Sequence, residues 1–128
     1  MNANDVRHLE NIISLLDRLI RDTQFVSYEN FIADPLLPDA SAMRLIAIGE
    51  QVNRITDKTQ EQYPHIPWRA ICGLRNRFAH DYFAMDNTML WDILCNDIAV
   101  LREQIADVLA ECSKAMNHYA LSGNKLGK

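Results

Sequence analysis

The 128-residue chain lacks several features that define large protein classes. It has no run of about 20 apolar residues, which a membrane-spanning helix needs. Its first ten residues also lack the basic and then apolar layout of a signal peptide. Glycine and proline occur four times each, and there is no low-complexity stretch. We therefore expect a folded cytoplasmic protein without a membrane partner.

Cysteine and histidine are too scattered to build a disulfide framework or a metal site. The three cysteines are odd in number and widely spaced, so we expect free thiols at Cys72, Cys95 and Cys112. Three of the four histidines have no ligand-like spacing, namely His8, His65 and His118. The sequence predicts no metal and no cofactor.

Excess positive charge is missing as well. Thirteen basic residues face 17 acidic ones, which gives a formal net charge of -4 at pH 7. A protein that coats nucleic acid needs a general attraction for phosphates, and this chain does not offer one. An enzyme that contacts a few phosphates needs only a local basic patch, so that class remains open.

What the chain does contain is apolar residues at three- and four-residue steps, which is typical of amphipathic helices. They predict helices over residues 5–22, 28–33 and 38–55, a fourth that begins at Pro67, and a long last helix capped by Asp86 or Asn87. No alternating strand pattern or internal repeat is present. We predict one all-α, up-and-down bundle of four to five helices over residues 1–112, followed by an extension over residues 113–128 that lengthens the last helix or hangs free.

Two features of the predicted helix over residues 38–55 concern its contacts. Gly49 costs about 1 kcal/mol of helix propensity there, so we expect it to let a neighbouring helix approach closely. Glu50 and Arg54 are four residues apart and are predicted to form a surface ion pair.

Residues 73–83, GLRNRFAHDYF, concentrate polar chemistry as no other segment does. Arg75 stays cationic and offers forked donors that suit a phosphate, with Arg77 as a second contact. His80 can exchange a proton near neutral pH. RNA cleavage needs a base that takes the proton of the ribose 2′-OH, an acid that protonates the leaving oxygen, and a cation near the phosphate. The segment supplies these groups without a metal.

Geometry limits how one copy of the segment can act. Five helical residues turn through about 500°, so Arg75 and His80 lie roughly 140° apart. The length of arginine and the position of His80 near the helix end reduce that separation, and Asn76 is placed to hold the imidazole from four residues away. Because one arginine and one histidine are few groups for two proton transfers, we expect a symmetric homodimer.

The spacing alone also permits a structural interpretation. Arginine, asparagine and histidine near a helix end commonly cap carbonyl groups or meet solvent. Tyr82 is, by the same reasoning, an amphipathic residue at the margin of the core.

The segment from Arg75 to Tyr82 resembles the HepT-like branch of the HEPN family. The similarity extends over about residues 5–109 and includes several ordered segments, at residues 27–31, 48–50, 53–54, 64–68 and 73–83. It implies a helical bundle, a homodimer with the motifs at its interface, and metal-independent endoribonuclease activity on RNA. Arg75 and His80 correspond to the catalytic pair of that family, and Asn76 to the polar residue after the arginine.

The resemblance also implies a biological setting. It predicts the toxin component of a type VII toxin–antitoxin system, partnered by a minimal nucleotidyltransferase antitoxin that transfers AMP from ATP to Tyr82. A different class remains as the alternative: a non-catalytic helical subunit that binds and positions a nucleotidyltransferase, which the net negative charge favours.

Overall fold

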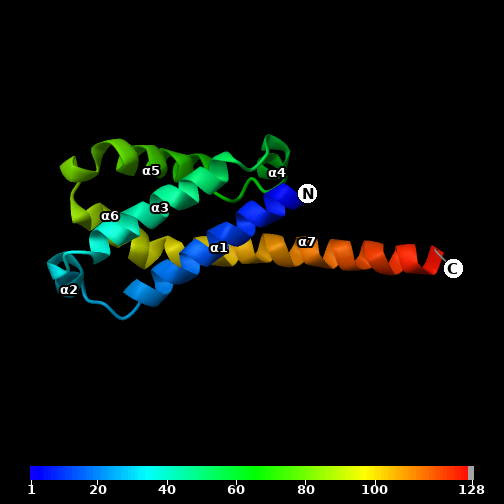
Figure 1. Cartoon of the computed structure of the whole chain (residues 1–128), viewed down its shortest axis with the longest axis horizontal. Helices are drawn as coiled ribbons and strands as arrows, with labels where there is room; N and C mark the ends of the chain where they lie inside the picture. The colour runs from blue at the N-terminus through cyan, green and yellow to red at the C-terminus, as the bar shows by residue number, and fades with distance from the viewer. Residues whose placement is uncertain (127–128) are drawn as a thin grey trace.

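The computed structural model describes the backbone of residues 1–126 and the side chains of residues 1–115. Helices are the only regular elements in this part of the chain, so the predicted all-α bundle is confirmed (Figure 1). Five helices have ten residues or more: α1 (Ala3–Thr23), α3 (Leu37–Asn53), α5 (Trp68–Asp81), α6 (Asn87–Asn96) and α7 (Ile98–Leu126). Two helices of six residues, α2 (Tyr28–Ala33) and α4 (Asp57–Gln62), and the 3-10 turn η1 (Tyr82–Ala84) complete the order.

Side-chain caps start several of these helices where the sequence predicts them. The hydroxyl of Ser27 accepts a hydrogen bond from the backbone N–H of Asn30 at 3.1 Å and begins α2. The carboxylate of Asp86 accepts from the backbone N–H of Thr88 at 2.8 Å and begins α6. Each cap satisfies a donor that has no partner inside the helix.

Helix α4 was not expected from the sequence, which shows only polar residues there. Its sole buried residue is Thr59, so no apolar period marks it. Thr56 caps it, accepting a hydrogen bond from the backbone N–H of Thr59. A cap of this kind, followed by Asp57 in the first turn, is the signal that the sequence offered.

The predicted long last helix is divided at Asp97 into α6 and α7. Backbone hydrogen bonds still cross this point, from Asp97 N–H to the Ile93 carbonyl at 2.9 Å and from Leu101 N–H to the Asp97 carbonyl at 3.0 Å. Neither glycine nor proline lies nearby, so nothing in the sequence signals the division. Helix α7 continues through the predicted extension to Leu126, and residues 127–128 lie outside the described part.

Helix α1 lies between α3 and α7, and α3 packs along α5 on its other side (Figure 1). The apolar stripes of these helices form one core, in which Leu9, Ile48 and Ile105 are almost completely buried. Ion pairs join the same helices at the surface, from Arg102 to Asp17 at 2.7 Å and from Arg44 to Asp22 at 2.6 Å. Within the described residues, no helix has the length and apolar character to span a membrane.

Candidate active site

Helix α5 carries the candidate motif and is anchored at both ends. At its start, the indole N–H of Trp68 donates to the backbone carbonyls of Gln60 and Tyr63, at 3.1 and 3.0 Å. Just after its end, the hydroxyl of Tyr82 donates a hydrogen bond to the carboxylate of Asp39 on α3. These contacts fix the helix that bears Arg75 and His80.

Arg75 lies against α3 at Gly49, which confirms the predicted close approach of a neighbouring helix. A Cβ atom added to Gly49 would stand 2.2 Å from Cβ and 2.8 Å from Cγ of Arg75, which no real contact allows. The guanidinium of Arg75 donates from Nη1 to the amide oxygen of Asn76 at 3.0 Å and from Nη2 to the carboxylate of Glu50 at 3.4 Å. About a quarter of the Arg75 side chain, 28%, remains accessible to solvent.

The predicted pairing of Glu50 with Arg54 is wrong. Within the described residues, the ion pair of Glu50 is made with Arg75, 25 positions further along the chain. The close packing of α5 on Gly49 brings the Arg75 side chain beside Glu50, so a contact between helices replaces the one expected within a helix. Such a contact cannot be read from spacing along one helix.

The exposed side of α5 forms a basic stripe. Asn76 and Arg77 are neighbours and the other steps are three or four residues, and all members are exposed: Arg69, Gly73, Asn76, Arg77 and His80. A Cβ atom added to Gly73 would meet no heavy atom within 4 Å, so the middle of the stripe is open. Arg69 and Arg77 give this side of α5 a local positive charge on an acidic protein, which the exposed Asp81 at the helix end partly offsets.

His80 lies in the last turn of α5, at the predicted helix end. It is exposed, and no hydrogen bond joins it to Arg75 or Asn76 in the described structure. The Asn76 amide, which was predicted to hold the imidazole, binds the Arg75 guanidinium instead through its oxygen. One chain thus presents Arg75 and His80 on different sides of α5, as the 140° separation requires.

Tyr82 is half-buried between α3 and α5. Burial and the carboxylate of Asp39 raise the pKa of Tyr82 to about 12, because both disfavour the phenolate. Its ring lies 6.5 Å from that of Phe78 and 5.6 Å from that of the fully exposed Phe83, measured between centroids. The tyrosine is therefore neutral at physiological pH, with its hydroxyl proton directed at Asp39.

Sequence reasoning gave Asp39 no role at the site and paired Glu50 with Arg54, so it missed the contacts that both make in this region. Both lie on α3: Glu50 contacts Arg75 of α5, and Asp39 contacts Tyr82 just after α5. Gly49 beside Glu50 was the available signal, since a close approach there implies that the flanking side chains meet the approaching helix.

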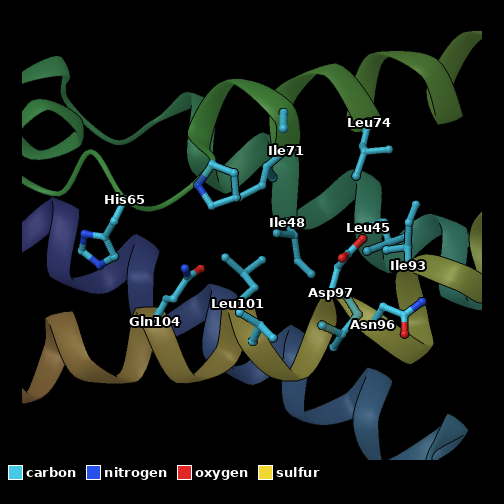
Figure 2. A pocket seen from close by; sticks show the side chains of 14 residues that line it. Leu45, Ile48, His65, Ile71, Leu74, Ile93, Asn96, Asp97, Leu101 and Gln104 are labelled. Atoms are coloured by element: carbon cyan, nitrogen blue, oxygen red, sulfur yellow. The ribbon is translucent and has the colours of Figure 1, made fainter.

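A mostly apolar cavity of about 420 Å³ opens between α3, α5, α6 and α7 (Figure 2). Figure 2 shows Ile71 and Leu74 of α5 on one side of it and Leu101 and Gln104 of α7 on the other. Leu74 lines the cavity, whereas Arg75, Asn76 and His80 do not.

The predicted free thiols are confirmed for all three cysteines. Among the described residues, no three His, Cys, Asp or Glu side chains gather as metal ligands would. His8 and His65 lie on separate elements of the fold, and the side chain of His118 lies outside the described residues.

An all-helical bundle that presents an Arg-x4-His motif on one helix is the arrangement expected of the HEPN family. The model of the family described as Ribonuclease HepT-like matches residues 9–108, and the chain belongs to this family. No solved structure matches the chain.

Named relatives agree with this placement. A "Putative RNase" of Caldanaerobacter subterraneus is 30% identical over 102 residues, which cover 80% of this chain and 91% of the relative. A "Putative RNase" of Methanocaldococcus jannaschii is 30% identical over 112 residues, covering 87% and 97%. A "Probable ribonuclease HepT" of Thermococcus cleftensis is 30% identical over 102 residues, covering 80% and 93%.

Proposed function

We propose that this chain is a metal-independent endoribonuclease that acts in the cytoplasm as the toxin of a type VII toxin–antitoxin pair. The observation that carries the proposal is the basic stripe of α5, with an accessible Arg75 beside it and His80 exposed at its end. The family of the chain and the names of its relatives point to the same chemistry.

The proposed reaction is attack of the ribose 2′-oxygen on the adjacent phosphorus atom, which expels the 5′-oxygen of the next nucleotide. A histidine takes the proton of the 2′-OH, and a protonated histidine gives one to the leaving oxygen. The Arg75 guanidinium stabilises the charge that gathers on the phosphate oxygens, and Arg77 holds a neighbouring phosphate.

These roles are best met by a homodimer. In one chain, Arg75 faces α3 whereas His80 points to solvent, so the two side chains do not converge. A second copy related by twofold symmetry would offer its own His80 to the same phosphate and supply the second proton-transfer group. The apolar cavity beside Leu74 provides surface that such a contact would cover.

Tyr82 is the proposed point of control. A nucleotidyltransferase antitoxin would join the Tyr82 oxygen to the α-phosphorus of ATP, release pyrophosphate and leave AMP on the tyrosine. Tyr82 follows His80 by two residues, so an attached AMP would occupy the space that RNA needs. Asp39 is already bonded to the hydroxyl proton that the transfer must remove.

The test is to induce the wild-type chain, His80→Ala and Arg75→Ala in cells and to follow growth and RNA integrity. Circular dichroism of the purified proteins checks that each variant folds. Growth arrest and RNA cleavage by the wild type alone would support the nuclease and its two residues. Harmless behaviour of all three folded proteins would contradict it.

That negative outcome would favour a non-catalytic subunit that binds and positions a nucleotidyltransferase. The net charge of -4 and the carboxylates of Asp39 and Glu50 beside the motif favour this second candidate, because they repel RNA phosphates. It predicts a stable complex with the partner and no effect of His80→Ala on growth.

A further inference from the structure

Three neighbouring groups hold the Arg75 side chain, one at its aliphatic stem and two at its guanidinium. Its aliphatic stem lies directly over the backbone of Gly49, where a side chain of any size would collide with it. Nη1 binds the amide oxygen of Asn76 on the same helix, and Nη2 binds the Glu50 carboxylate of α3. The remaining nitrogen, Nε, is buried without an acceptor in the described structure. The stem is fixed by packing, and the direction of its head depends on Glu50 and Asn76.

We infer that Glu50 is a positioning residue for the proposed RNA cleavage: it turns the Arg75 guanidinium toward the phosphate that Arg75 stabilises. The inference rests on the function proposed above and adds a residue of α3 to a motif otherwise confined to α5.

The donor count of arginine permits this role. A guanidinium carries five N–H donors, and Asn76 and Glu50 each take one of the four on the terminal nitrogens. One N–H therefore remains on each terminal nitrogen for a phosphate oxygen. Glu50 can hold the guanidinium while RNA is bound.

The contact between Glu50 and Arg75 is long and partly exposed, so we expect it to affect the orientation of the guanidinium more than the stability of the fold. At 3.4 Å, with 47% of the Glu50 side chain accessible, the pair adds little to the stability of the fold. The pair instead sets the direction of the Arg75 guanidinium. A misplacement of about 1 Å at a reacting group can cost about 10²-fold in rate.

Three substitutions of Glu50 distinguish the length of its side chain from its negative charge. Glu50→Gln keeps an oxygen at the same distance without the charge, whereas Glu50→Asp keeps the charge on a side chain one methylene shorter. Glu50→Ala removes both. If Glu50 positions Arg75, Gln retains most of kcat, while Asp and Ala each lose about 10- to 100-fold, with KM for RNA nearly unchanged because binding is preserved. Glu103→Ala, at an exposed glutamate of α7, is the matched control and keeps wild-type kinetics.

A second measurement does not depend on activity. Nitrogen-15 NMR of the Arg75 side chain reports rotation about its Cζ–Nε bond. That rotation should be slow in the wild type and in Glu50→Gln, and faster in Glu50→Asp and Glu50→Ala.

The two measurements distinguish failure of the inference from failure of the proposed function. A wild type that cleaves no RNA contradicts the function, and the NMR experiment still decides whether Glu50 holds Arg75. Equal rotation in all variants overturns the inference even if RNA is cleaved. Asp retaining more kcat than Gln would assign Glu50 an electrostatic or proton-transfer role, and a lower KM in Glu50→Ala would make it a competitor of RNA. Either result overturns positioning.

Discussion

The hydroxyl of Tyr82 donates a hydrogen bond to the carboxylate of Asp39, and this bond ties the residues after α5 to the first turn of α3. It holds the proposed modification site in its neutral form. The hydroxyl proton of Tyr82 and the Asp39 carboxylate that accepts it are thus already in contact.

Replacing Asp39 with Asn should lower the pKa of Tyr82 from about 12, because the nearby negative charge is removed. Burial, the larger cause, persists, so the pKa should stay above the ordinary value of about 10. Ultraviolet titration of tyrosinate in Asp39→Asn measures the change, and Tyr82→Phe identifies the signal. Unchanged titration in Asp39→Asn would show that the carboxylate does not act on Tyr82.

The burial of Tyr82 and, after it, the bond to Asp39 also predict how stability depends on pH. Because folding raises the pKa of Tyr82, the stabilisation is complete below about pH 10 and is lost as the pH rises toward about 12. The wild type should therefore lose its stability advantage over Tyr82→Phe within that window. Urea unfolding of both proteins at several pH values tests this, and a constant difference across the window would contradict it.

Gly49→Ala and Gly73→Ala should change stability in opposite directions. Alanine at position 49 collides with Arg75, and overpacking of this kind costs about 1–3 kcal/mol. Alanine at position 73 meets open space inside a helix and should gain up to about 1 kcal/mol. Thermal unfolding of the two variants compares them directly. Equal effects would mean that the gap at Gly49 closes without strain.

Asp5→Asn should destabilise the fold at neutral pH. The almost fully buried Asp5 carboxylate accepts hydrogen bonds from the Thr56 hydroxyl and the Thr59 hydroxyl, each at 2.6 Å, and from the Thr56 backbone N–H at 3.1 Å. Losing charged bonds of this kind costs about 1–3 kcal/mol. The urea midpoint at pH 7 measures the loss, and Asp107→Asn, at an exposed position of α7, should leave it unchanged.

That destabilisation should shrink in acid. Burial by itself raises the pKa of the Asp5 carboxyl, but the bonds from Thr56 and Thr59 outweigh burial and leave the pKa below its usual value. Its stabilisation is therefore present above about pH 4 and is lost as the pH falls through the lowered pKa. A deficit that persists at low pH would assign the effect to packing.

The cysteines should differ in reactivity at neutral pH. Burial raises the pKa of the Cys72 thiol, although Arg75 acts in the opposite direction, and the thiol donates to the Asn53 amide oxygen at 3.0 Å. Cys95 is exposed and Cys112 is buried. A thiol-specific reagent followed by mass spectrometry should therefore label Cys95 first. Labelling of Cys72 as fast as Cys95 would contradict the protection, and all three should react alike in urea.

Most helices were predictable because their signals are local. The stripe from Leu9 to Ile20 predicted α1, and Ser27 and Pro35 bounded α2. Helix α4 escaped because only Thr59 of it is buried, and the division at Asp97 escaped because the apolar stripe passes through it without interruption. Periodicity reports the buried face and says little about helices that lack one.

The motif could be read from the sequence, but its surroundings could not. Arg75, Asn76 and His80 lie within six residues of one another, so their types and spacing are visible in the chain. Glu50 meets Arg75 from 25 positions away and Asp39 meets Tyr82, just after α5, from 43 positions away, and only the packing of α3 on α5 brings them there. Their roles depend on register between helices, which a single sequence does not state.

That register is set by Gly49. Helix α5 turns Ile71, Arg75 and Phe78 inward at successive turns, and the narrow stem of Arg75 is the part that fits over the glycine. Sliding α5 by one turn, about 5.4 Å, would bring the branched side chain of Ile71 to a backbone that leaves no room for it. The missing side chain at Gly49 thus prevents α5 from sliding along α3. The positions of His80 and Tyr82 along the bundle follow from this.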